Sequence, residues 1–184
     1  MMTEGNTLFT IPGFQVNYLR ENDARSLQRL LENCTDYCML VDGHPPGENS
    51  AQALIANRPE DRSINDKAVF GLYNHERNLV GVLDVLKNYP FQNDWWIGLM
   101  LIDPDYRNQG LGRQIVQSFM DWVRLQRVKR IYLGVVECND KAFKFWQSVG
   151  FTVVERQPPR KFGNLTHIVI KMVHVFSRED NDRN

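Results

Sequence analysis

Hydrophobic residues recur along the chain at two spacings, and each spacing predicts a type of element. A helical spacing begins after Asn22 or Asp23, either of which can cap a helix. The apolar members of this first helix are Leu27, Leu30, Leu31, Cys34 and Cys38. Short apolar runs between polar turns predict strands at 67–73, 79–86, 95–102 and 131–136. The turn N-H-E-R-N at 74–78 suits an antiparallel hairpin between the first two of these strands.

The remaining segments complete an alternating order of strands and helices. Strands are expected at 14–19, 151–155 and 165–173, and helices at 51–57, at 140–148 and from Gly110 onward. The long helix after Gly110 carries Leu111, Ile115, Phe119 and Trp122 on one face. The order βααβββαβαββ predicts a three-layer α/β domain over 14–175, with a mixed sheet covered by helices on both faces. The polar tail 177–184 is expected to be disordered.

Charge and composition narrow the classes of partner. The 22 Lys and Arg residues are balanced by 22 Asp and Glu, so no positive field indicates nucleic acid or an anionic membrane. The longest apolar run, 95–102, is less than half a membrane span, and the N-terminus lacks a signal-peptide pattern, so a cytoplasmic protein is expected. Cys34 and Cys38 could meet on one helix face near His44, but buried small apolar residues are the commoner role of cysteine, and no metal site is predicted.

The segment R-N-Q-G-L-G at 107–112 lies between an apolar strand and a helix. Unpaired N–H groups and the macrodipole make a helix N-terminus a site for anions, and glycines let an oxygen approach the backbone. A diphosphate fits such converging N–H groups, whereas the plain alternative is a turn with a glycine for helix packing. A P-loop is excluded because the chain has no Gly-Lys pair. The dinucleotide fingerprint fails at Ile115, although Glu137 at the end of the next strand keeps a nucleotide-binding domain as a weak alternative.

Two motifs together resemble a known superfamily. R-N-Q-G-L-G matches the [Q/R]-x-x-G-x-[G/A] motif of the GCN5-related N-acetyltransferases (GNAT), and V-V-E-C-N-D-K-A-F-K-F-W-Q-S-V-G-F at 135–151 resembles a second motif of that superfamily. The element order from about 14 to 175 is also similar. The resemblance implies a mostly antiparallel sheet of the acyl-CoA N-acyltransferase fold. It also implies acetyl-CoA as acyl donor and a primary amine of a small molecule or peptide as acceptor.

The resemblance also implies the residues that hold acetyl-CoA. The amides of Gln109–Arg113 would bind the pyrophosphate, and the 99–103 backbone would pair with the pantetheine arm like an added strand, where the sheet splays. Asn139 would hydrogen-bond this arm, while Phe143 and Trp146 would line the cofactor side. Arg107 and Arg113 can add charge-assisted hydrogen bonds. The full expected set is Met100, Leu101, Ile102, Arg107, Asn108, Gln109, Gly110, Leu111, Gly112, Arg113, Asn139, Phe143 and Trp146.

The catalytic groups are less well defined by the sequence. The superfamily's frequent tyrosine acid would fall at Trp146, and an indole cannot transfer a proton, so the thiolate leaves unassisted, through water, or with help from a tyrosine such as Tyr132. No acid occurs in 97–102, which leaves Asp84 and Glu137 as candidate bases. Asp84 would lie either at a cleft or on a solvated face, and Glu137 is either a base or an exposed strand-end acid. A backbone N–H near Met100 to Ile102 would stabilise the oxyanion.

The acceptor is not specified, but some residues could reach it. Trp95 and Trp96 point to opposite faces of their strand, so one is expected in the core and the other at the acceptor pocket. Tyr37, Tyr89 and His44 could also reach this pocket, and R-Q-P-P-R-K-F-G-N at 156–164 could cover it or form a homodimer contact. The leading interpretation is an N-acetyltransferase that acts by direct transfer in a ternary complex. The alternative is a non-catalytic acyl-CoA-binding or sensor module.

Overall fold

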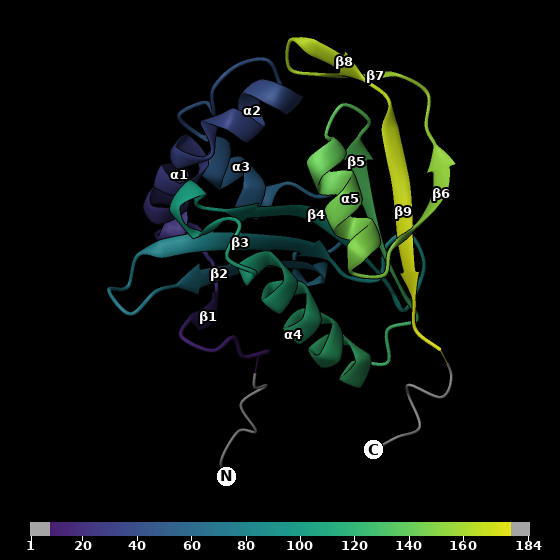
Figure 1. The fold of residues 1–184 in the computed structure, drawn as a ribbon, viewed down its shortest axis with the longest axis horizontal. Helices are drawn as coiled ribbons and strands as arrows, with labels where there is room; N and C mark the ends of the chain where they lie inside the picture. Colours follow the sequence, from purple (N-terminus) through teal and green to yellow (C-terminus); the bar gives the residue numbers. More distant parts are fainter. Residues whose placement is uncertain (1–7, 178–184) are drawn as a thin grey trace.

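The computed structural model describes residues 8–177, which form a mixed seven-stranded sheet with helices on both faces (Figure 1). Its strands, in spatial order, are β1 (Gln15–Tyr18), β2 (Lys67–Tyr73), β3 (Leu79–Leu86), β4 (Asp94–Ile102), β5 (Arg130–Val136), β9 (Val169–Val175) and β6 (Thr152–Arg156). Every neighbouring pair is antiparallel except β4 with β5. The predicted mixed, mostly antiparallel sheet between helices is confirmed.

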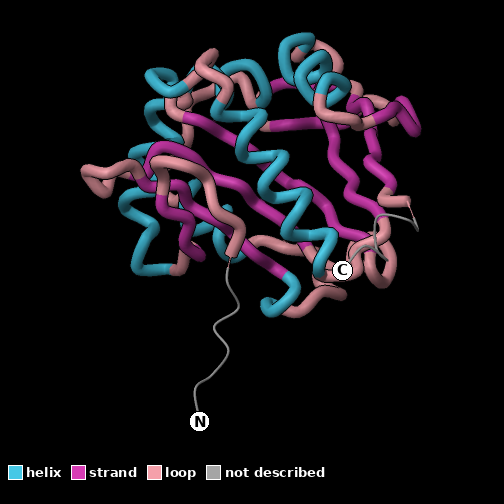
Figure 2. The backbone as a smooth tube through the Cα atoms, turned by 60° about the horizontal axis from the view of Figure 1, so that its bottom comes forward, coloured by secondary structure: helices cyan, strands magenta, loops and turns pink. Residues whose placement is uncertain are grey.

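Two helical layers cover the two faces of this sheet. Helices α4 (Leu111–Leu125) and α5 (Asp140–Ser148) pack on one face, and Figure 2 shows α4 running across the strands. Helices α1 (Ala24–Asn33) and α3 (Ser50–Ala56) pack on the other face, and α2 (Thr35–Val41) follows α1. Single 3₁₀ turns occur at Glu21–Asp23, Ile64–Asp66 and Pro104–Tyr106. Among residues 8–177, none of the helices combines the length and apolar character that a membrane span requires.

The apolar face predicted for the long helix α4 is confirmed, because its residues are buried. Leu111, Ile115, Phe119 and Trp122 are all buried against the sheet, in a core that also contains Phe70 of β2 and Ile131 of β5. Aromatic rings concentrate there, with Phe119 contacting Trp122 and Trp95 at centroid distances of 6.2 Å each. This face is therefore the main core, and it anchors the start of α4 beneath the glycine loop.

The first helix differs from the prediction because it breaks at Cys34. The hydroxyl of Thr35 donates to the Glu32 carbonyl at 2.6 Å, which removes an acceptor from the helix ladder. The thiol of Cys34 donates to the Ile102 carbonyl at 3.5 Å, which ties the break to the end of β4. Asp23 occupies the N-cap position of α1, but its carboxylate accepts the N–H of Arg20 and closes the preceding turn. After the break, α2 places Tyr37 and Val41 near residues of β4 and β5.

The C-terminal part also differs from the single strand expected at 165–173. Residues Leu165–His167 form β8, which pairs with β7 (Arg160–Phe162) as a separate two-stranded hairpin, and the main sheet resumes at Val169. Pro158 and Pro159 precede β7 and have no N–H to continue the β6 ladder. The hairpin stands above the sheet near α2 (Figure 1). The expected disordered tail lies, apart from Ser177, outside the described residues.

Candidate active site

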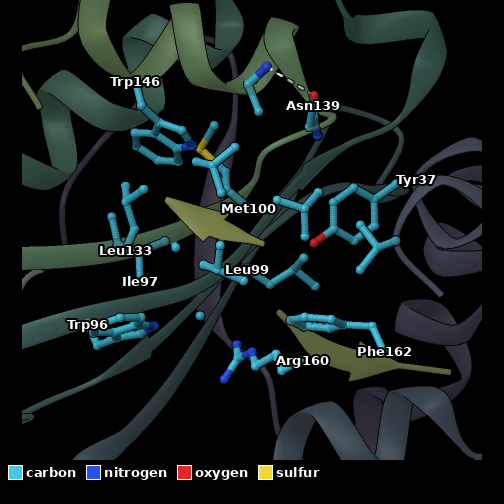
Figure 3. A pocket seen from close by; sticks show the side chains of 17 residues that line it. Tyr37, Trp96, Ile97, Leu99, Met100, Leu133, Asn139, Trp146, Arg160 and Phe162 are labelled. Carbon is cyan, nitrogen blue, oxygen red and sulfur yellow. Dashed lines mark hydrogen bonds between the residues drawn. The ribbon is translucent and has the colours of Figure 1, made fainter. Parts of the chain in front are cut away.

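A wedge opens where β4 and β5 separate. The parallel ladder joins Asp94–Ile97 to Arg130–Leu133 and then ends, while β4 continues to pair with β3 as far as Ile102. A cavity of about 170 Å³ occupies the wedge and is shown in Figure 3. We call it the acceptor-side cavity, because Trp96 and Tyr37, which were expected near the acceptor, line it. It is lined by Tyr37, Val41, Trp96, Ile97, Gly98, Leu99, Met100, Leu133, Gly134, Val135, Val136, Asn139, Ala142, Trp146, Arg160, Phe162 and Val169. The splayed sheet implied by the motif resemblance is present.

A bulge at Gly98 shapes the wall of this wedge. Asp84 pairs with Leu99 and Val85 with Ile97, so Gly98 is left between them without a partner on β3. A Cβ atom on Gly98 would lie 2.6 Å from Oδ2 of Asp84, so a larger residue would displace the Asp84 carboxylate. Gly98, Leu99 and Met100 all line the cavity, so the bulge lies in its wall.

Asp84 lies in neither of the two surroundings that the sequence left open. Its side chain is buried beneath the α1–α3 layer and forms an ion pair with Lys67, whose Nζ lies 2.7 Å from Oδ1. Burial raises the pKa of the Asp84 carboxyl, and the Lys67 ammonium opposes that rise. Asp84 does not line the acceptor-side cavity, nor does it line a second, larger cavity that lies beside the glycine loop. Its place is structural, as the buried partner of Lys67.

Glu137, the other candidate base, is an exposed strand-end acid. Its carboxylate accepts two hydrogen bonds from Arg156, at 2.6 and 2.8 Å, and this pairing lowers its pKa. Glu137 lines neither cavity, although its neighbours Val136 and Cys138 do. A carboxylate held by Arg156 outside the wedge is poorly placed to accept a proton from an amine within it.

A second and larger cavity of about 850 Å³ joins the end of β4 to the glycine loop and α5. We call it the cofactor cleft after the predicted cofactor residues that line it. Ten of the thirteen predicted cofactor residues line it: Met100, Leu101, Ile102, Arg107, Asn108, Gly110, Gly112, Arg113, Asn139 and Trp146. Three do not. Gln109 turns its side chain to the Asp105 carbonyl at 2.8 Å, Leu111 is buried in the core, and Phe143 packs against the core while Phe145 lines the cleft.

The loop before α4 presents consecutive backbone donors to this cleft. Asn108 and Gly110 adopt left-handed backbone angles, with φ of 60° and 82°, which reverse the chain ahead of the helix. Within the part of the chain that the structure describes, the N–H groups of 108–113 have no recorded acceptor, and pairing resumes with Gln114 N–H to Gly110 C=O at 3.1 Å. With the dipole of a fifteen-residue helix behind them, these donors form a site suited to a diphosphate.

The two predicted arginines also hold the cleft together. Arg107 donates to the Ile102 carbonyl at 2.7 Å and forms an ion pair with Asp36 of α2, which lowers the pKa of that carboxyl. Arg113 donates to the carbonyl and hydroxyl oxygens of Ser148, at 3.2 and 3.0 Å. Both guanidinium groups therefore brace elements of the cleft that they line, and the charge-assisted hydrogen bonds expected of them stay a prediction.

The two cavities adjoin at five residues that line both: Tyr37, Met100, Asn139, Ala142 and Trp146. The side chain of Asn139 accepts the Ala142 N–H at 3.1 Å and caps α5, so this residue fixes the start of the helix as well as facing the cleft. The phenol of Tyr37 points into the acceptor-side cavity (Figure 3), and burial raises its pKa to about 12. The junction therefore carries a hydroxyl that stays protonated at neutral pH.

The aromatic residues divide between core, cavity and surface. Trp95 is buried in the core and Trp96 lines the acceptor-side cavity, as the alternation along the strand predicts. Tyr132 is buried beneath Trp96 at a centroid distance of 6.3 Å, and Tyr89 packs edge-on against Trp96 at 5.9 Å. Neither tyrosine lines a cavity, so Tyr132 is not placed to assist a leaving thiolate.

The segment 156–164 supplies residues that the sequence did not single out. Arg160 and Phe162 of β7 line the acceptor-side cavity, so this segment covers the wedge. His44 lies behind it, where a Cβ atom on Gly163 would come within 2.8 Å of its Nε2. Within residues 8–177 no group of three or more metal-binding side chains is found, and Cys34, Cys38 and His44 do not form one. The two adjacent prolines were the only sequence signal of a covering segment.

Comparisons with known proteins agree with this architecture. A model described as the acetyltransferase (GNAT) family matches residues 27–151. A glucosamine 6-phosphate N-acetyltransferase of Trypanosoma brucei brucei is 33% identical over 32% of this chain and 37% of that protein, so the match spans little more than a third of that relative's length.

Solved structures match over most of the chain. An acetyltransferase of Thermus thermophilus superposes with a TM-score of 0.74 and 26% identity, over 90% of this chain and 99% of that one. A spermidine N-acetyltransferase of Vibrio cholerae, solved with CoA and spermine, shares the fold with a TM-score of 0.69 and 20% identity over 89% of this chain and 95% of that one. Since the family match covers more than half of the residues, the chain belongs to the GNAT family of acetyltransferases.

Proposed function

We propose that this protein transfers an acetyl group from acetyl-CoA to a primary amine, directly, within a ternary complex. The observation that carries the proposal is the junction of the two cavities at the β4–β5 wedge. One cavity offers a row of backbone N–H donors for a diphosphate, and the other is a separate, smaller space on the far side of Met100. A thioester at the junction would meet an amine that arrives from the smaller space.

The CoA moiety fits the cofactor cleft in two places. Its pyrophosphate would accept hydrogen bonds from the N–H groups of 108–113 at the start of α4. Its pantetheine arm would add to the edge of β4 beyond Ile97, where β5 no longer pairs with that strand. Support for this placement is the family membership and the CoA-bound structure of the Vibrio cholerae neighbour.

The reaction requires the amine nitrogen to attack the thioester carbonyl carbon. The C–N bond forms, the C–S bond breaks, the nitrogen loses one proton, and CoA leaves as a thiolate that solvent protonates. Of the residues lining the acceptor-side cavity, none is a carboxylate or histidine, so we assign the proton on nitrogen to water. A backbone N–H near Met100, which lines both cavities, would stabilise the negative charge that develops on the carbonyl oxygen.

Tyr37 is the side chain that we assign to the leaving group. Its pKa of about 12 exceeds that of a thiol, roughly 8.5, so full proton transfer to the thiolate would be unfavourable. A neutral phenol can still donate a hydrogen bond to the departing sulfur. Tyr37 in α2 would thus supply the hydroxyl that Trp146 in α5 cannot.

The alternative is an acyl-CoA-binding module without turnover, favoured by Trp146 and by the lack of a base among the lining residues. The two functions are separated by incubating the protein with acetyl-CoA and a panel of primary amines. We expect thiol release above the amine-free rate, with the N-acetylated amine identified by mass spectrometry. A saturable complex that never releases thiol above that rate would establish the binding module instead.

A further inference from the structure

The acceptor-side cavity carries a net positive charge, which is unusual for a site that binds a cationic amine. Of its 17 lining residues, Arg160 alone carries a charge at neutral pH, and no carboxylate is among them. A polyamine would bring further positive charges into this space with no opposite charge to meet them. The cavity therefore selects against the class of acceptor that carries more than one cation.

Arg160 also lacks the acidic partner that the neighbouring arginines have. Within residues 8–177 no carboxylate lies within ion-pair distance of Arg160, and its guanidinium carbon lies 4.6 Å from the ring centroid of Phe162. In Figure 3 the guanidinium points from beside Phe162 toward Trp96. Two other arginines near the site are paired with carboxylates, Arg107 with Asp36 and Arg156 with Glu137, whereas Arg113 donates to Ser148. Arg160 is thus held at the cavity with its hydrogen-bond donors available.

The surroundings of the cavity do not reverse this charge. Lys171 pairs with Gly134 of the lining and places its Nζ 4.9 Å from the ring centroid of Tyr132. Glu155 pairs with Lys171 from β6 on the other side, and neither residue lines the cavity. Asp42 acts on Tyr37, whose pKa it helps to raise, but does not line the cavity. The carboxylate of Glu137 is already paired with Arg156.

The remaining walls set the size and character of the acceptor. Tyr37, Trp96 and Phe162 converge on the space from α2, β4 and β7 (Figure 3). The volume of about 170 Å³ is below the roughly 300 Å³ at which drug-sized pockets begin. A small amine, or the end of a longer molecule, would fill the cavity and pack its carbon atoms on these rings.

We propose that the acceptor is a small primary amine that also carries an anionic group, a carboxylate or a phosphate, and that Arg160 binds this group. The proposal rests on the proposed acetyltransferase function and adds the class of its acceptor. A planar guanidinium suits both anions, because its parallel N–H groups match two oxygens of either. With the anion at Arg160, the amine would reach the junction near Tyr37 and Met100.

The test uses matched amines that differ by one anionic group: phenylalanine against phenethylamine, and phosphoethanolamine against ethanolamine, with spermidine as the polyamine. Thiol release is measured and kcat/KM is corrected for the free-base fraction of each amine. We expect one anionic member to exceed its neutral partner by at least about tenfold, the factor for one charge-assisted hydrogen bond. Which pair responds distinguishes carboxylate from phosphate.

Two variants of the same strand complete the experiment. Arg160→Gln should abolish the preference while leaving acetyl-CoA affinity unchanged. Lys161→Gln, an exposed neighbour that loses the same charge and lines neither cavity, should keep it. If neutral amines or spermidine react as well as the anionic ones, or if Arg160→Gln keeps the preference, the acceptor class is wrong although the acetyltransferase stands. Acetyl-CoA binding without turnover of any amine would overturn both.

Discussion

Replacement of Gly112 by aspartate places a carboxylate directly in the proposed pyrophosphate site. A Cβ atom there would lie 3.4 Å from Cδ1 of Ile102 and from the ring of Phe145, so the side chain fits without forcing the backbone to move. A carboxylate ~5 Å from one phosphate charge and ~7 Å from a second, at an effective dielectric constant of ~40, is repelled by about 3 kcal/mol. This corresponds to about a hundredfold increase in the Kd for acetyl-CoA.

The fold should survive this change. Gly112 lies in the first turn of α4, where an acidic residue stabilises the helix by roughly 0.3–1 kcal/mol through the macrodipole. Calorimetric titration gives the Kd, and circular dichroism melting checks the fold. Gln117→Glu adds the same charge on the exposed side of α4, outside the cleft, and should change the Kd by less than about twofold. Unchanged binding by a folded Gly112→Asp protein would refute the pyrophosphate assignment.

Three further results are expected. Tyr37→Phe should lower kcat about tenfold with little change in acetyl-CoA affinity, because one hydrogen bond to the leaving sulfur is lost, whereas Tyr132→Phe should leave kcat unchanged in the same steady-state assay. With rising pH, kcat/KM for the amine should increase until the free base of the acceptor dominates. It should then stay constant, with no decrease at any pH under 10. The raised pKa keeps the Tyr37 phenol neutral over this range, and any folding stability due to the neutral form is complete below pH 10 and lost toward pH 12. A decrease of kcat/KM with rising pH that begins below pH 10 would indicate a different proton donor. Asp84→Asn should destabilise the fold by about 3–5 kcal/mol in urea unfolding because it leaves Lys67 buried without its partner, and a Lys67→Met, Asp84→Leu double variant should regain most of this loss.

The parts of the fold that follow a simple period were predictable from the sequence. The strands at 67–73 and 79–86 and the helix at 140–148 have the predicted bounds, because apolar runs or helical spacing end at polar turns. The break at Cys34 was not predictable from spacing, since it depends on the Thr35 hydroxyl and on a contact with Ile102, which is distant in sequence. Tertiary contacts here override a continuous helical pattern.

In the candidate site, too, local features could be predicted from the sequence, whereas tertiary contacts could not. The glycine loop is a local feature, so its backbone donors and most of its neighbours could be named from the motif. The pairing of Arg107 with Asp36 could not be predicted, because Asp36 comes from another helix. Asp84 looked catalytic because a carboxylate interrupts an apolar strand, and only the position of Lys67 on β2 reveals the ion pair.

The acceptor side depends most on tertiary structure. Arg160 and Phe162 reach the wedge because β7 folds back over it, far from β4 in sequence. Their segment has no motif, and its prolines indicate only that regular pairing stops before it. Residues that line the cavity from a covering hairpin therefore have to be found in the folded structure.

Calorimetric titration of the protein with acetyl-CoA, with ATP and NAD as controls, tests the central claim most directly. The structure predicts saturable one-to-one binding of acetyl-CoA and none of either control. The reason is that the cleft joins the proposed diphosphate site to a strand edge that suits the pantetheine arm. Absence of acetyl-CoA binding, or equal binding of NAD, would contradict the assignment of the wedge as an acyl-CoA site and the transferase mechanism built on it.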